Sequence, residues 1–187
     1  MSFGQSAAPD ALLPLFNSAA PVAAISVAAA LAGRRPWQAM ALGALAGPMT
    51  MVGYYGTSAL RGFGVSGSWV LLWCTAGVAV GAVLGSVVWE LRSSKAWRAP
   101  GTGRTSHVWR GLAAATWPGI AIGEAAHGIA RIADSTPVGY WWTELAVGVA
   151  VLAVTCARRA RSRLSASVAV LGTVVVAAGL FLTYGAL

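Results

Sequence analysis

"WVLLWCTAGVAVGAVLGSVVWEL", residues 69–91, is an apolar run whose only charged member, Glu90, stands next to its end. An α-helix needs about 20 mainly apolar residues to cross the hydrocarbon core of a bilayer. Five further stretches reach that length, at 11–32, 36–60, 109–133, 138–157 and 165–187. The sequence therefore predicts an all-α, polytopic membrane protein, with six transmembrane helices in a single transmembrane domain over residues 1–187.

The composition supports this prediction, because 57% of the 187 residues are hydrophobic and only 10% are charged. A soluble domain carries about 25% charged residues. The net charge of +8 could indicate a nucleic-acid partner, but no soluble basic domain is present to carry such binding. We therefore expect the lipid bilayer to be a partner of the chain and expect no nucleic-acid partner.

The basic residues indicate how the chain is oriented in the membrane. Of the 13 Lys and Arg residues, only Arg61 and Arg131 lie near the ends of predicted helices on one side. The others gather on the opposite side: Arg34, Arg35, Arg92, Lys95, Arg98, Arg104, Arg110, Arg158, Arg159, Arg161 and Arg163. Such an excess marks the cytoplasmic side. We expect a multi-pass protein of the cell membrane, with both termini on the non-cytoplasmic side and a basic cytoplasmic loop at 92–108 that contains His107.

The fourth predicted helix contains "GEAAHGIARIAD", residues 123–134, with four ionisable residues. At 100° per residue these four side chains fall within about 80° of one another on one helix face. They are Glu124, His127, Arg131 and Asp134, and Trp117 and Gly128 flank the same face. Glu124 lies about 14 Å of helix rise before the end of this predicted helix, within the hydrocarbon. An ionisable residue at that depth is costly, which makes it a functional candidate.

Other polar and aromatic residues fall in the same outer half of the predicted bundle. Glu144 lies about 9 Å into the fifth helix. Four aromatic side chains are predicted to lie deeper in the membrane than its interface: Tyr54, Tyr55, Trp73 and Trp117. Trp69, Tyr140, Trp142 and Tyr184 are interpreted as belt residues, which are common at membrane interfaces. The inner halves are almost entirely apolar, so the pattern predicts an aromatic cavity closed toward the cytoplasm and not a channel.

The chain has few residues that bind metals or cofactors. Two histidines and the two separated cysteines, Cys74 and Cys156, cannot build a usual metal site. No glycine-rich phosphate loop and no CxxC pair is present. We expect no metal and no cofactor.

An acid beside aromatic rings suits cyclisation of a prenyl chain that is started by protonation. A buried carboxylic acid that keeps its proton can act as a general acid, and aromatic faces stabilise a carbocation. The predicted catalytic residues are Glu124 as the proton donor, His127 as a residue that tunes it, and Glu144 as a second acid or terminating base. The predicted partner is a lipophilic prenylated small molecule, and its predicted contacts are Asn17, Tyr54, Tyr55, Trp73, Trp117, Arg131 and Trp141.

Two resemblances bear on this hypothesis. In size, helical membrane character and intramembrane acids, the chain resembles the small integral-membrane terpene cyclases of meroterpenoid and indole-terpenoid pathways. The segments "LPLFNSAA", "GYYG" and "GEAAHG" look like those of an uncharacterised family of small six-helix integral-membrane proteins from high-GC bacteria. The first resemblance implies a terpene cyclase, and the second implies six helices but no reaction.

Two other functions stay open at this point. Six helices around an outward pocket also resemble the substrate-capture subunits of vitamin importers, in which Arg131 and Glu144 would clamp a zwitterionic or anionic solute. Those subunits place both termini in the cytoplasm, opposite to the orientation predicted here. Alternatively, the polar stripe only holds the helices of a structural membrane protein together. No oligomeric state is predicted.

Overall fold

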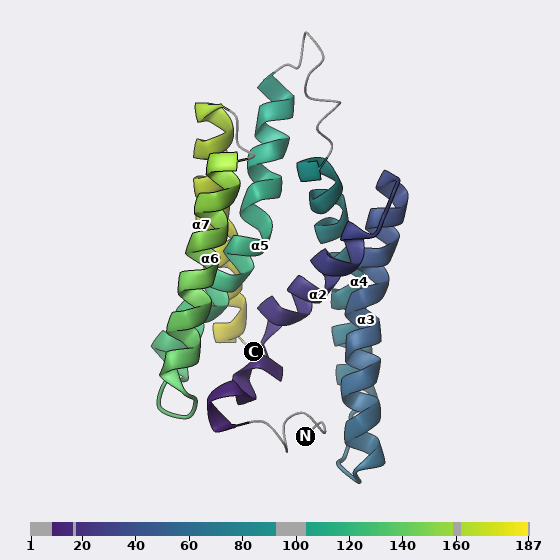
Figure 1. Cartoon of the computed structure of the whole chain (residues 1–187). Helices are drawn as coiled ribbons and strands as arrows, with labels where there is room; N and C mark the ends of the chain where they lie inside the picture. The colour runs from purple at the N-terminus through teal and green to yellow at the C-terminus, as the bar shows by residue number, and fades with distance from the viewer. Residues whose placement is uncertain (1–8, 17, 93–103, 159–161, 187) are drawn as a thin grey trace. The chain divides into compact units, whose positions relative to one another are not determined.

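The computed structural model of the chain describes residues 9–16, 18–92, 104–158 and 162–186. Within these residues it has one 3₁₀ helix and six α-helices (Figure 1). They are η1 (Asp10–Phe16), α2 (Ala19–Leu31), α3 (Pro36–Leu60), α4 (Gly67–Arg92), α5 (Arg104–Arg131), α6 (Val138–Arg158) and α7 (Arg163–Ala186). The all-α fold class is confirmed.

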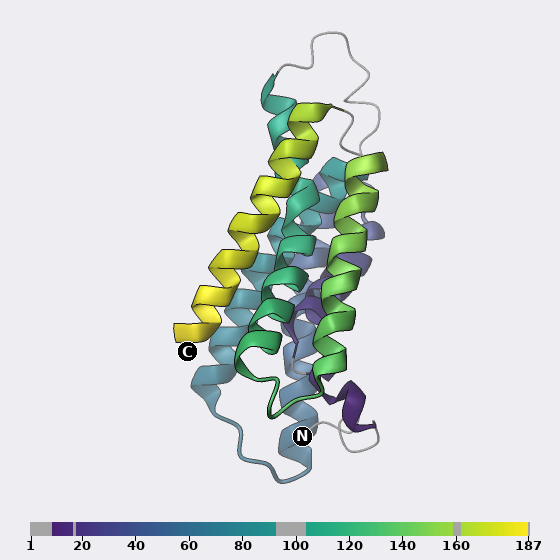
Figure 2. The ribbon, with the colours of Figure 1, turned by 90° about the vertical axis from the view of Figure 1, so that its left-hand side faces the viewer.

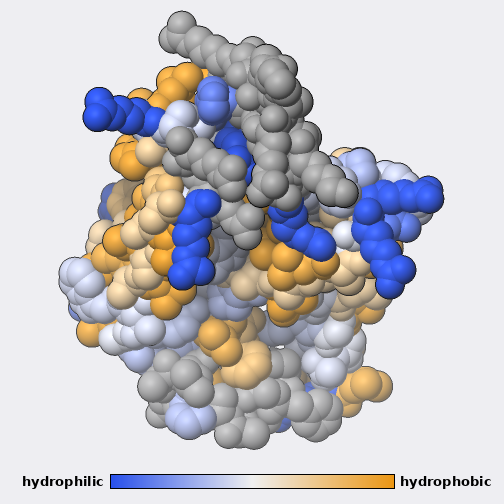
Figure 3. Space-filling model, turned by 45° about the horizontal axis from the view of Figure 1, so that its top comes forward, coloured by the Kyte–Doolittle hydropathy of each residue, from blue (hydrophilic) through white to orange (hydrophobic). Residues whose placement is uncertain are grey.

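Three of these helices are long and apolar enough to cross a membrane: α4, α6 and the part of α7 from Arg163 to Gly185. Large hydrophobic side chains lie exposed along them, among them Leu71, Val154 and Leu182. Figure 3 shows such hydrophobic side chains spread over the visible surface. An exposed apolar surface of this kind is unfavourable in water. These features are consistent with a membrane protein, and the count of six crossings stays a prediction.

The prediction of one continuous helix over 11–32 is wrong. The 3₁₀ helix η1 ends at Phe16, and α2 begins only at Ala19, after the cap residue Ser18. Pro21 stands in the first turn of α2, where its missing N–H has no intrahelical partner to lose. The 13 residues of α2 rise about 20 Å, which is less than the roughly 30 Å of a bilayer core.

The other five predicted helices match observed ones to within a few residues, and the differences are largest for α5. This helix begins at Arg104, so His107, expected in the cytoplasmic loop, is helical. It ends at Arg131, and Asp134 therefore lies in the turn before α6 instead of on the predicted polar face. Asn17 and the loop residues 93–103 lie outside the described residues.

The chain divides into two compact units, Met1–Trp89 and Glu90–Leu187. The prediction of one transmembrane domain therefore stays a prediction. In the first unit, α3 and α4 touch through glycines that recur every four residues. A Cβ atom added to Gly47 would stand 2.6 Å from the carbonyl oxygen of Gly77. Small residues at such spacing let membrane helices approach to backbone contact.

The ends of α3 follow from local sequence. Pro36 stands at the first turn, and the side chain of Gln38 accepts a hydrogen bond of 3.0 Å from the backbone N–H of Arg34. At the other end, Gly62 adopts a φ of 79°, which is costly for residues with a Cβ. This lets the N–H groups of Gly62 and Phe63 bond back to carbonyls of the last turn.

The second unit consists mainly of α5, α6 and α7, which lie side by side (Figures 1 and 2). Near their starts, the Ser165 hydroxyl of α7 donates a hydrogen bond of 2.9 Å to the carbonyl of His107 on α5. Further along, a Cβ atom on Gly123 would stand 2.7 Å from Cα of Ala177. Residues later in α5 therefore contact residues later in α7. The two helices run parallel, and their backbones are in close contact.

Candidate functional site

The acid at the centre of the predicted polar face is buried between α5 and α7. Glu124 is 4% exposed, and it directly follows Gly123, the residue at which the two backbones approach each other. Its Oε1 atom accepts a hydrogen bond of 3.2 Å from the hydroxyl of Tyr184 on α7. The close glycine contact therefore places this carboxyl group against the neighbouring helix.

The next turn of α5 adds an imidazole among aromatic rings. The centroid of the His127 ring lies 5.3 Å from that of Tyr184 and 5.8 Å from that of Phe181. Phe181 and Tyr184 are three residues apart and therefore share one face of α7. Nδ1 of His127 is buried and makes no hydrogen bond to the part of the chain that the structure describes.

One turn beyond His127, Arg131 completes the row on α5. Its guanidinium carbon lies 5.9 Å from the ring centroid of Phe181, a distance typical of a cation–π contact. Arg131 is exposed, as expected for the end of the polar face. The cation is thus held at the rim of the site by an aromatic ring.

The second predicted acid comes from α6. Glu144 is 8% exposed and is therefore buried, like Glu124. Two buried carboxyl groups of the second unit therefore come from two helices, Glu124 from α5 and Glu144 from α6.

Trp141, expected in the substrate-contacting wall, has a packing role in the structure. It is 4% exposed, and its Nε1 donates a hydrogen bond of 2.7 Å to Oγ1 of Thr136 in the turn before α6. The Thr136 hydroxyl in turn donates to the carbonyl of Ile132 over 2.7 Å. The indole thus fixes the turn that joins α5 to α6.

The other predicted contact residues are divided between the units. Trp117 lies half-buried on α5, whereas Tyr54 and Tyr55 on α3 and Trp73 on α4 belong to the first unit. The rings of Tyr54 and Tyr55 meet edge to face at a centroid distance of 5.1 Å. The structure thus brings together Glu124, His127 and Arg131 around two rings of α7, and it buries Glu144 on α6 of the same unit.

Sequence reasoning missed two residues of this site. The interpretation of Tyr184 as an interfacial belt residue does not account for its contacts with Glu124 and His127. Phe181 is not among the residues that the sequence analysis selects. A signal was present in the spacing of small α7 residues, because Ala169, Thr173 and Ala177 recur every four residues, as do small residues on α5. Pairing those two rows would have placed the end of α7 beside Glu124.

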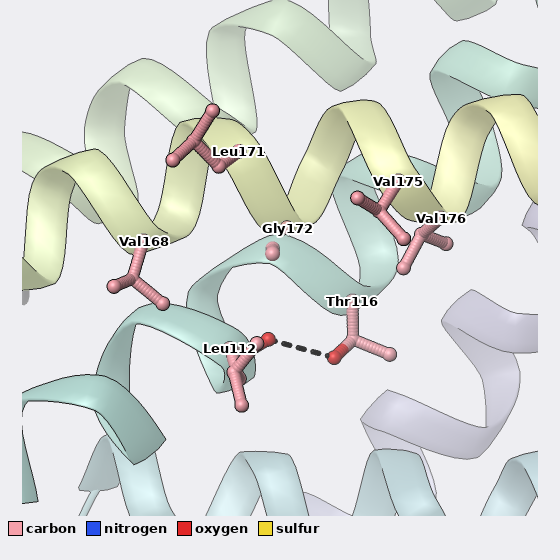
Figure 4. Close-up of a pocket in the computed structure, with 8 residues that line it drawn as sticks. Leu112, Thr116, Val168, Leu171, Gly172, Val175 and Val176 are labelled. Carbon is pink, nitrogen blue, oxygen red and sulfur yellow. Dashed lines mark hydrogen bonds between the residues drawn. The ribbon is translucent and has the colours of Figure 1, made fainter. Parts of the chain in front are cut away.

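A groove of about 350 Å³ lies between α5 and α7, and its lining residues precede Glu124 along α5 and Tyr184 along α7 (Figure 4). Its one polar side chain, Thr116, directs its hydroxyl to the carbonyl of Leu112 at 3.0 Å, so the groove presents an apolar surface. Thr116 precedes Glu124 by about 12 Å of helix rise. The lining residues are Leu112, Ala115, Thr116, Val168, Leu171, Gly172, Val175 and Val176.

These observations define an all-helical protein in which three helices are long and apolar enough to cross a membrane and a buried acid on α5 contacts α7. In the described residues, no three His, Cys, Asp or Glu side chains gather as a metal site would require. The chain belongs to the DUF6518 family, a family of unknown function, whose model matches residues 1–187. No curated protein and no solved structure matches the chain.

Proposed function

We propose that this protein is a membrane-embedded enzyme that protonates a lipophilic prenylated substrate and thereby starts its cyclisation. The observation that carries the proposal is the carboxyl group of Glu124, which is 4% exposed and hydrogen-bonded to Tyr184. The ring of Tyr184 packs against that of His127, which in turn contacts Phe181. An acid withdrawn from water and surrounded by rings is suited to form a carbocation and to stabilise it.

The reaction needs no second reactant. Glu124 gives its proton to a substrate double bond, so a C–H bond forms as the carboxyl O–H bond breaks, and the adjacent carbon becomes cationic. The next double bond attacks that carbon and closes a ring. Loss of a proton to Glu144 or to the imidazole of His127 ends the sequence, and the proton returned to Glu124 restores the acid. The product is an isomer of the substrate.

The groove between α5 and α7 supports a lipophilic substrate. Its walls are apolar, and it lies on the same helix pair as Glu124, about 12 Å away by helix rise. In this proposal the prenyl chain lies along the groove and presents its terminal double bond to the acid. The groove would thereby hold the reacting bond in place, which is a major part of catalysis in general.

The proposal includes the topology expected from the sequence. Six crossings of the cell membrane require η1 and α2 to form the first one together, because α2 alone is too short. The arginines at the α2–α3, α4–α5 and α6–α7 connections would lie in the cytoplasm, which places both termini outside. The Glu124 end of the groove then faces the outer leaflet.

Cyclisation in D₂O tests the chemistry. The full chain in nanodiscs is given a farnesylated phenol, and the products are analysed by mass spectrometry. A product that started with protonation carries one deuterium on carbon, and Glu124→Gln should abolish it. Glu90→Gln, which removes an acid at the end of α4, is the matched control and should retain it. Absence of turnover by the natural sequence, or undiminished turnover by Glu124→Gln, would contradict the proposal.

A purely structural role for the polar residues is the second candidate. It is favoured by the Tyr184–Glu124 hydrogen bond, which links two helices and would contribute to helix association in lipid. It predicts that Glu124→Gln lowers stability while no cyclisation exists to be lost.

A further inference from the structure

We infer that Tyr184 is the positioning residue of this site: its hydroxyl holds one oxygen of the Glu124 carboxyl, and its ring holds the imidazole of His127. The hydroxyl lies 3.2 Å from Oε1, and the ring centroids are 5.3 Å apart. The catalytic consequence rests on the proposed function. The positioning itself does not.

The position of Tyr184 is fixed by the packing of α7 on α5. A Cβ atom on Gly119 would meet the side chain of Val176 at 2.6 Å, and one on Gly123 would meet Ala177. These contacts leave no room for α7 to slide. Because helical side chains lean toward the N-terminus of their helix, the side chain of Tyr184 reaches back to Glu124.

The hydrogen bond also distinguishes the two oxygens of the acid. Tyr184 donates to Oε1, so a protonated Glu124 carries its own hydrogen on Oε2. Oε2 is therefore the atom that delivers the proton to the substrate. Loss of the phenol hydroxyl would remove the contact that distinguishes Oε1 from Oε2.

Infrared spectroscopy tests this positioning without any substrate. In the full chain in nanodiscs, the Glu124 bands are identified as those lost in Glu124→Gln. Tyr184→Phe keeps the ring and removes only the hydroxyl, so these bands should shift. Thr183→Val removes the adjacent hydroxyl, which bonds to the carbonyl of Gly179, and should leave them in place. Unshifted Glu124 bands in Tyr184→Phe would overturn the inference.

The reciprocal measurement covers the case in which Tyr184→Phe does not fold. The chain has four tyrosines, and Glu124→Met, which leaves no oxygen to accept the hydrogen bond, should shift the phenol C–O band of one of them. If all four keep their wild-type bands, Tyr184 does not hold Glu124.

Kinetics then test the catalytic consequence. Tyr184→Phe should lower kcat for the farnesylated phenol about tenfold, with KM little changed, because the hydroxyl contacts the acid and not the substrate. Equal kcat in the variant would overturn a catalytic role for the positioning. Full turnover by Glu124→Gln would instead refute the proposed function, and the infrared result would still decide whether Tyr184 holds the carboxyl.

Discussion

Gly128 of α5 lies directly beneath the indole ring of Trp141 on α6, so that a Cβ atom added to the glycine would stand 2.6 Å from Cε3 of the ring. The same indole donates its N–H to Thr136. The missing side chain at position 128 is therefore what allows Trp141 to be buried and to fix the α5–α6 turn. This makes Gly128, the second glycine of "GEAAHG", a packing residue of the site.

Gly128→Ala should lower the free energy of unfolding by about 1–3 kcal/mol, because the added methyl group must displace a rigid, buried ring. Thermal unfolding of the purified protein in detergent measures the loss. Gly179→Ala on α7 is the matched control, since a Cβ there meets nothing within 4 Å. It should be neutral or slightly stabilising. Equal stability of the two variants would contradict the packing role.

The contact between α3 and α4 leads to a second prediction. A Cβ atom on Gly81 would collide with the carbonyl oxygen of Gly43, and backbone cannot move aside as a flexible side chain can. Gly81→Ala should therefore push the helices apart and lower the melting temperature of the chain. Gly56→Ala, at an open position on α3, should leave it nearly unchanged. If Gly81→Ala has the same melting temperature as the natural protein, the close contact between α3 and α4 does not contribute to stability.

Long apolar runs made most of the fold predictable. The bounds of α3 agree with the predicted 36–60 because Pro36 starts that helix and a Schellman turn at Gly62 ends it. Over 11–32, the apolar run hides a break at Ser18, because hydropathy is insensitive to backbone geometry. Asp134 was assigned to a helix face for the same reason: periodicity continued past Arg131, where the helix ends.

The site was predictable only on the helix that carries the acid. Glu124 and His127 share a face of α5 by spacing alone, and the structure has both in one cluster. Tyr184 is 60 residues away along the chain, and its place beside Glu124 depends on which faces of α5 and α7 pack together. A single sequence does not identify which helix packs against which, or the register in which the two helices pack. Those depend on the glycine contacts at Gly119 and Gly123.

The Glu124–Tyr184 pair should show a measurable coupling in stability. In a double-mutant cycle, Glu124→Met and Tyr184→Phe should couple by about 0.5–1.5 kcal/mol, the size of one hydrogen bond, because Met has no oxygen to accept it. The cycle of Glu124→Met with Thr183→Val, whose hydroxyl bonds within its own helix, should be additive. Additivity in both cycles would indicate that the hydrogen bond contributes nothing to the folded state.

Filling the groove should discriminate between substrates by chain length. Val175 lines the groove and is 71% exposed, whereas its neighbour Val174 is 60% exposed and does not line it. Both positions accept a larger side chain without disturbing the core. Val175→Trp should therefore lower kcat/KM for a farnesylated phenol more than for a geranylated one, because the longer chain occupies more of the groove. Val174→Trp should change neither value. If the two tryptophan variants behave alike on both substrates, the prenyl chain does not lie between α5 and α7, and the substrate reaches Glu124 by another side of the site.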